Sequence, residues 1–94
     1  MRNAFAESVF KLAKKEKDLI LLAGDIGNRL FDNFKLKFKN RFYNCGVAEA
    51  NMTGIASGLA SAGLKPITYT ITPFNTLKCL EQIKLDICYP NLPV

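Results

Sequence analysis

The sequence contains no histidine and only three cysteines, Cys45, Cys79 and Cys88. No two of the cysteines form a Cys-x-x-Cys pair, and a thiolate zinc site needs such close spacing or imidazole ligands. We therefore expect no metal ligands on this chain. An odd number of cysteines without a secretory signal favours free thiols in the reducing cytoplasm.

Long hydrophobic runs are also missing from the sequence. No segment reaches the length that is needed to span a bilayer. The N-terminal stretch MRNAFAESVFKLAKK is interrupted by Glu7 and Lys11, unlike the apolar core of a secretory signal. We expect a cytoplasmic protein that has no membrane partner.

Acidic residues are in the minority, because 13 Lys and Arg stand against 8 Asp and Glu, a formal net charge of +5. The lysines gather at 11–17 and 35–39, beside the end of a predicted helix and in a predicted connector. Charge runs of this kind are usually solvated faces, so nucleic acid is not expected as a partner. With 94 residues, of which 49% are apolar, the chain can form one small domain with a thin core that a partner could complete.

The hydrophobic pattern predicts helices that alternate with strands. In chain order we expect a helix over 4–15, a strand over 19–23, a short helix or turn within 31–39, a strand over 42–45, a helix over 48–62, a strand over 66–70 and a helix from 73 to about 88. The run LILLA (19–23) is continuously apolar, which is typical of a strand buried on both faces of a parallel sheet. Gly63 is expected to be the left-handed cap of the helix before it. The predicted fold class is α/β, with a parallel sheet and helices on both faces.

Three short stretches follow the predicted strands. Asp25 follows the first, Gly46 to Glu49 follow the second, and Thr72 to Phe74 follow the third. In parallel sheets of this class, ligands bind beyond the carboxyl ends of the strands. We therefore expect these stretches to lie at a common ligand-binding edge.

Glu49 falls in the first turn of the predicted helix over 48–62. An acid at that position is favoured by the helix dipole, by about 0.3–1 kcal/mol. Alternatively, a carboxyl group in a partly apolar site at the end of a strand can exchange a proton with a ligand. The spacing alone favours the first explanation and leaves the second open.

The same helix has small residues at a spacing of four, namely Gly54, Gly58 and Ala62. Each glycine inside a helix costs roughly 1 kcal/mol relative to alanine. The close approach of another backbone would compensate for this cost. That backbone belongs either to the chain's own sheet or to a second subunit, and the sequence leaves both open.

Three segments resemble a known family: DIG (25–27), NCGVAEANMTGIASGLASAG (44–63) and TPFNTLKCLEQIKLDICYPNLPV (72–94). The resemblance is to the pyrimidine-binding domain of transketolase-like, thiamine-diphosphate-dependent enzymes, and most of all to the separate C-terminal subunit of transketolases split across two chains. It covers about residues 2–94, and GVAEANM followed by GIASGLA is its fairly specific part. It implies a thiamine-diphosphate pyrimidine-binding fold that is incomplete, so that residues 1–94 form a partial domain.

The resemblance assigns roles to two residues of the ligand-binding edge. Glu49 matches the glutamate that hydrogen-bonds N1′ of the cofactor's aminopyrimidine. Proton exchange there favours the imino tautomer, whose N4′ can deprotonate C2 of the thiazolium. Glu49 is thus the predicted catalytic residue and a cofactor contact. Phe74 matches an aromatic residue that stacks on the aminopyrimidine ring, and an ordinary core phenylalanine at a helix start is the alternative.

Two residues of the loop after the first strand are further candidates. Asp25 matches an acidic residue near the thiazolium and is a predicted cofactor contact, although it could instead cap its own loop. Arg29 lies where the family often contacts a substrate phosphate, which suits a guanidinium, and a solvated loop arginine is the alternative. Lys78 occupies a position that relatives often give to arginine, and the pattern assigns it no role.

The chain also departs from the family. Asn51 stands where many relatives have a histidine two residues after the glutamate. No GDG-type motif, which binds magnesium and the diphosphate in the family, is present. The resemblance therefore implies that magnesium and the diphosphate of thiamine diphosphate are held by a partner, the N-terminal-section chain of a split transketolase.

The expected activity is transfer of a two-carbon ketol unit between sugar phosphates by a complex of the two chains, which we also expect to self-associate. Within the same fold, a deoxyxylulose-phosphate synthase or the β-subunit of a 2-oxoacid dehydrogenase would use an equivalent glutamate. A different class of function is an inactive fragment or interaction module that pairs through the helix containing Gly54 and Gly58.

Overall fold

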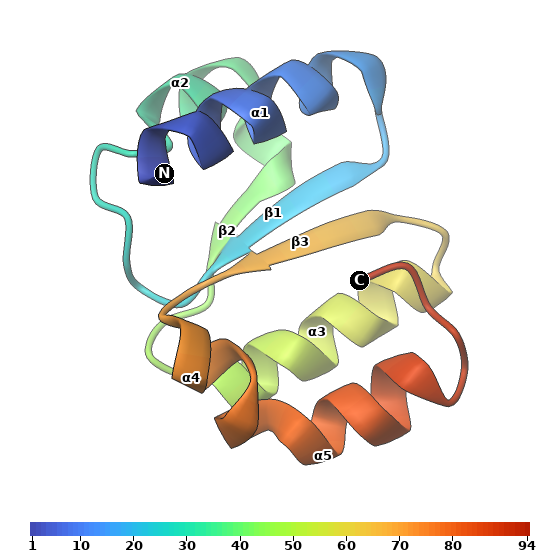
Figure 1. Cartoon of the computed structure of the whole chain (residues 1–94). Helices are drawn as coiled ribbons and strands as arrows, with labels where there is room; N and C mark the ends of the chain where they lie inside the picture. The colour runs from blue at the N-terminus through green and yellow to red at the C-terminus, as the bar shows by residue number, and fades with distance from the viewer.

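A three-stranded parallel sheet lies between two layers of helices in the computed structural model, which describes all residues from 1 to 94 (Figure 1). Along the chain the elements are α1 (Arg2–Lys15), β1 (Leu19–Ala23), α2 (Asp32–Lys37), the 3-10 turn η1 (Lys39–Arg41), β2 (Phe42–Asn44), α3 (Glu49–Ser61), β3 (Lys65–Tyr69), α4 (Thr72–Asn75), the 3-10 turn η2 (Leu77–Cys79), α5 (Leu80–Gln82) and the π-helical stretch η3 (Ile83–Cys88). This arrangement confirms the predicted α/β class, with helices on both faces of a parallel sheet.

The central strand β1 is buried along its whole length, as the apolar run LILLA predicts. Side chains alternate between the two faces of a strand. Leu19 and Leu21 therefore belong to the core cluster shared with α1 and α2, whereas Ile20 and Leu22 pack against α3. These two clusters hold the helical layers on the sheet.

The strand order β2-β1-β3 determines where a ligand can bind. From the end of β1 the chain leads to α2, on the face that α1 covers, and from the end of β3 it leads to α4, on the opposite face (Figure 1). Neighbouring parallel strands whose following loops turn to opposite faces leave a crevice between them. We therefore expect a ligand at the ends of β1 and β3, with the end of β2 beside them.

Arg41, the last residue of η1, joins the end of α1 to the start of β2. Its Nη1 donates to the carbonyl oxygens of Glu16 (2.8 Å) and Lys17 (3.0 Å), and its Nη2 donates to that of Ala13 (2.9 Å). The guanidinium carbon also lies 4.1 Å from the centroid of the Phe38 ring. Because the last carbonyl groups of a helix have no partner within it, a cation at this position satisfies them and interacts favourably with the helix dipole.

The predicted helix from 73 to about 88 is wrong as a continuous element. The one-turn helix α4 ends at Asn75, since Thr76 has φ −126° and ψ −84°, outside the helical region. The Thr76 hydroxyl donates to the carbonyl oxygen of Thr72 (2.7 Å), a local hydrogen bond that competes with regular helix continuation. Beyond Thr76 the chain runs through η2, α5 and η3.

The other elements agree closely with their predicted bounds. The ambiguous segment 31–39 contains the short helix α2. Helix α3 ends shortly before Gly63, which has φ +93° and is the left-handed cap that the sequence predicts. None of the helices combines the length and the apolar character that crossing a membrane requires.

The glycines of α3 do not face the sheet. Met52 and Ala56 of this helix pack against β1. A Cβ atom added at Gly54 or Gly58 would meet no atom within 4 Å. The explanation that these glycines allow close packing on the chain's own sheet is therefore wrong, and their face of α3 is open.

Candidate functional site

Glu49 is a buried carboxylate at the start of α3. The residue is only 2% exposed. Lys78 Nζ donates a hydrogen bond to Glu49 Oε2 over 2.6 Å and forms an ion pair with it. The N-terminus of α3 favours negative charge at the same place. Both interactions stabilise an ionised carboxyl group that has almost no contact with solvent.

These interactions lower the pKa of Glu49 from its ordinary value of 4.5. The largest cause is the hydrogen bond from Lys78, followed by a hydrogen bond from the backbone N–H of Glu49 itself. Burial acts in the opposite direction, and the charge of Lys78 lowers the pKa further. Glu49 is therefore ionised at neutral pH in the free chain, and Lys78 is the main cause of its lowered pKa.

Lys78 also connects Glu49 to Phe74. The ammonium nitrogen that donates to the carboxylate lies 5.4 Å from the centroid of the Phe74 ring. Phe74 is 42% exposed, so it is not an ordinary core residue. The structure thus brings two sequence-predicted residues together around one cation, and one of them offers an open aromatic face.

Asp25 is held by Asn44, a residue to which the sequence pattern assigned no role. Asn44 Oδ1 accepts hydrogen bonds from the backbone N–H groups of Asp25 (3.1 Å) and Gly46 (2.9 Å), and Asn44 Nδ2 donates to Asp25 Oδ1 (2.8 Å). Asp25 has φ +55°, in the left-handed region that aspartate tolerates better than most residues. Asn44 therefore ties the loop after β1 to the segment that leads into Glu49. An asparagine at a strand end, two residues before a glycine, was the available signal.

The ends of β1 and β3 meet α3 at Gly24. A Cβ atom at Gly24 would lie 3.0 Å from Thr70 Oγ1 and 3.7 Å from Glu49 Cγ, so these three residues are close neighbours. The Gly24 N–H donates to the carbonyl oxygen of Tyr69 over 3.0 Å, which keeps the two strand ends together. Thr70 Oγ1 is buried and has no hydrogen-bond partner. A buried hydroxyl in this state is available to a polar atom of a ligand.

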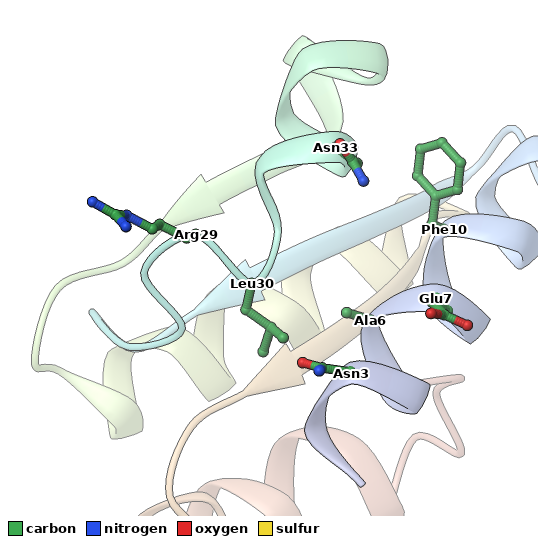
Figure 2. A pocket seen from close by; sticks show the side chains of 7 residues that line it. All are labelled: Asn3, Ala6, Glu7, Phe10, Arg29, Leu30 and Asn33. Carbon is green, nitrogen blue, oxygen red and sulfur yellow. The ribbon is translucent and has the colours of Figure 1, made fainter.

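Arg29 lies apart from these residues. It has φ +65° and lines a cavity of about 270 Å³ between its loop and α1. In Figure 2 its guanidinium extends away from the other labelled side chains, most of which belong to α1. The cavity that Arg29 lines is formed largely by α1, whereas Glu49 belongs to α3, and α1 and α3 cover opposite faces of the sheet (Figure 1).

A larger cavity, of about 680 Å³, opens at the crevice between the loops after β1 and β3. Its walls include Ile26, Thr70 and Ile71 from these loops and Phe5 from α1. Thr70 and Glu49 are both neighbours of Gly24, so this cavity lies next to the site of Glu49.

The arrangement fits a flat heteroaromatic ring. A carboxyl group can share a proton with a ring nitrogen, an exposed phenyl ring provides a stacking surface, and the Thr70 hydroxyl can bind one more polar atom. The structure contains no group of three or more His, Cys, Asp or Glu side chains that could hold a metal ion.

The comparisons with known proteins agree on one family. Residues 1–94 match the family described as "Transketolase, pyrimidine binding domain". The chain is 36% identical over 95 residues to the putative transketolase C-terminal section of Methanocaldococcus jannaschii, which covers 100% of this chain and 30% of that protein. It is 32% identical to one of the subunits of the apulose-4-phosphate transketolase of Phocaeicola vulgatus, over 94% of this chain and 28% of that protein.

Two further similarities extend the comparison. The 1-deoxy-D-xylulose-5-phosphate synthase of Clostridium tetani is 32% identical over 98% of this chain and 15% of its own length. A solved structure described as a split gene transketolase, an inactive beta4 tetramer, superposes with a TM-score of 0.86 at 32% identity. That superposition covers 99% of this chain and 31% of the solved one, so the chain spans less than a third of these relatives.

The match covers every residue of the chain, and the parallel sheet agrees with it, since a solved structure of a split gene transketolase superposes on the whole fold. The chain therefore belongs to the transketolase pyrimidine-binding domain family, a family of thiamine-diphosphate-dependent enzymes.

Proposed function

We propose that this chain contributes the aminopyrimidine side of a thiamine-diphosphate site in a transketolase-like enzyme that transfers two-carbon ketol units between sugar phosphates. The proposal rests on Glu49, a carboxylate that is 2% exposed at the carboxyl end of a parallel sheet. Membership of the pyrimidine-binding family supports it. Relatives that are described as transketolase sections or subunits favour ketol transfer among the reactions of this fold.

The residues at the strand ends fit the aminopyrimidine part of the cofactor. Glu49 would bind the ring nitrogen N1′, Phe74 would stack on the ring, and the unpaired hydroxyl of Thr70 is available to a further polar atom. Asp25 would lie toward the thiazolium. When bound, thiamine diphosphate supplies a nucleophilic carbon and an electron sink for cleavage of the bond next to a ketose carbonyl.

The part of Glu49 is to hold and exchange one proton. Burial favours its protonated form, while the hydrogen bond and the charge of Lys78 favour its ionised form, so both forms are accessible as the contacts of Oε2 change. Asn44 accepts hydrogen bonds from both the loop after β1 and the segment before Glu49, and so holds these two segments together. In this proposal the carboxyl group of Glu49 exchanges a proton with a ligand bound in the crevice between the strand ends.

A second chain would hold the diphosphate and its magnesium, as the N-terminal section of a split transketolase. Beside Phe74, the side chains of Leu77 and Leu80 are 77% and 61% exposed and offer an apolar surface to such a chain. Self-association would use the open face of α3 at Gly54 and Gly58. Arg29, if it contacts a substrate phosphate, would do so from the loop before α2.

Two other functions remain as alternatives. A deoxyxylulose-phosphate synthase would use an equivalent glutamate, and a relative of that description matches 98% of this chain. A non-catalytic interaction module would use the open glycine face of α3 and the exposed leucines. The interaction module differs from both enzymes in one clear way, because it has no use for a proton on Glu49.

The proposal is tested with the chain together with the diphosphate-binding chain that it captures from its own cell extract. We expect this assembly to bind thiamine diphosphate and magnesium in isothermal titration calorimetry. Phe74→Leu keeps an apolar side chain but removes stacking, which is worth about 0.5–1.5 kcal/mol, so binding should weaken roughly three- to tenfold. Tyr89→Leu, which also removes an exposed aromatic ring, is the matched control and should bind like the wild type. An assembly that binds no thiamine diphosphate would contradict the proposal.

A further inference from the structure

Lys78 has contacts that neither the sequence pattern nor the family assignment explains. Its ammonium nitrogen lies 2.6 Å from Glu49 Oε2 and 5.4 Å from the centroid of the Phe74 ring. These are the two groups that would bind and stack the aminopyrimidine. The cation therefore lies where the carboxylate and the aromatic face would meet a ligand.

The break in the C-terminal segment directs Lys78 to this place. The non-helical conformation of Thr76 ends α4 and starts η2, which packs against α3. The buried Cys79 anchors the turn, because its Sγ donates to the carbonyl oxygen of Phe74 over 3.1 Å. The backbone of Lys78 is thus held by its anchored neighbour Cys79, while the Lys78 side chain is 52% exposed and can move.

We propose that Lys78 is a positioning residue that closes the cofactor-free site: its ammonium takes the place of the aminopyrimidine between Glu49 and Phe74 and moves into solvent when the ring binds. The proposal rests on the function proposed above. An ammonium and a protonated ring nitrogen are both N–H donors to a carboxylate, so they compete for the same oxygen. The flexible lysine stem allows the exchange without movement of the backbone.

The ion pair between Lys78 and Glu49 has a physical reason in the cofactor-free chain. A buried carboxylate without a counter-ion is strongly unfavourable, and Lys78 supplies the counter-ion until a ligand arrives. Titratable groups on the elements that pack against α3 are Lys65, Tyr69, Lys78, Cys79, Glu81, Lys84, Asp86 and Cys88. Among them, only Lys78 contributes to the pKa of Glu49.

The first measurement is the titration of the Glu49 carboxyl group, followed by ¹³C NMR in the full chain without cofactor. Lys78→Met keeps the length of the side chain and removes its charge, so the pKa of Glu49 should rise. Lys84→Met removes one positive charge from the neighbouring stretch η3 and serves as the matched control, with an unchanged titration. An unchanged titration in Lys78→Met would overturn the proposal.

The second measurement is calorimetric binding of thiamine diphosphate with magnesium to the assembly with the diphosphate-binding chain. Removal of the competing ammonium should tighten binding about two- to fivefold in Lys78→Met, in line with the modest strength of half-exposed ion pairs. Lys78→Arg should bind like the wild type, and so should Lys84→Met. Equal or weaker binding by Lys78→Met, with normal binding by the wild type, would overturn the role of Lys78 alone. Absence of binding in every assembly would overturn the proposed function, and the role of Lys78 with it.

Discussion

Three residues support the site of Glu49, namely Lys78 of η2, Asn44 at the end of β2 and Gly24 after β1, and each has a separate task. Lys78 neutralises the carboxylate, Asn44 fixes the neighbouring loop and Gly24 leaves room for Thr70. The sequence predicted a catalytic role for Glu49 only through the family resemblance, because an acid in the first turn of a helix by itself favoured the helix-dipole explanation. It could not identify Lys78 or Asn44, because their partners lie 29 and 19 residues away along the chain.

A pH dependence of stability follows from the lowered pKa of Glu49. A carboxyl group with a lower pKa in the folded state contributes stability above its unfolded pKa, and this contribution is lost as the pH falls through the folded value. We expect Lys78→Met to reduce the free energy of unfolding above pH 4.5, with a difference from the wild type that shrinks on acidification below it. Urea unfolding between neutral and acid pH measures this, with Lys84→Met as the control. A difference that grows on acidification would show that the contact does not stabilise ionised Glu49.

At the scale of elements, the guanidinium of Arg41 links the end of α1 to the start of β2 by donating hydrogen bonds to carbonyl groups at the end of α1. Charge-assisted hydrogen bonds of this kind contribute about 1.5–3 kcal/mol, and Arg41→Met should lower the free energy of unfolding by about 1–3 kcal/mol. Arg41→Lys should restore only part of this loss, because an ammonium cannot reproduce the fork that reaches three carbonyl groups. Chemical denaturation provides the measurement. Equal stability of Arg41→Met and the wild type would show that these hydrogen bonds of Arg41 do not stabilise the fold.

The elements themselves were predictable to different degrees. The strand LILLA is buried on both faces, so its continuous apolar run left little ambiguity. Helix α3 and its cap at Gly63 follow from local chemistry that the sequence displays. The segment after Pro73 has helical spacing of apolar residues, but the hydroxyl of Thr76 finds a backbone partner and interrupts the helix. The helical spacing of apolar residues does not reveal that a side-chain hydroxyl competes for a backbone carbonyl group.

At the scale of the whole molecule, we propose that another subunit packs on the open glycine face of α3, where an added Cβ atom meets no atom of this chain. In the isolated chain, Gly54→Ala and Gly58→Ala meet no atom within 4 Å, so each should raise the free energy of unfolding by about 0.5–1 kcal/mol. The same substitutions should weaken self-association if a second backbone packs there. Ser61→Ala, on the exposed end of the helix, is the control for propensity alone.

Analytical ultracentrifugation and denaturation of the same variants separate these effects. More stable chains with weaker association would support a subunit contact at Gly54 and Gly58. Association that is unchanged in both variants would place self-association elsewhere on the molecule. The sequence predicted that a backbone approaches these glycines, but only the structure shows that the chain's own sheet does not.

Proton exchange at Glu49 is the central claim, and ketol transfer by the two-chain assembly tests it most directly. Glu49→Gln keeps the shape of the side chain and its ability to form hydrogen bonds, but glutamine cannot exchange a proton. Thiamine-diphosphate-dependent ketol transfer should therefore fall by about 100-fold or more, while the exposed Glu81→Gln leaves it unchanged. Ketol transfer by Glu49→Gln at the wild-type rate would contradict the account.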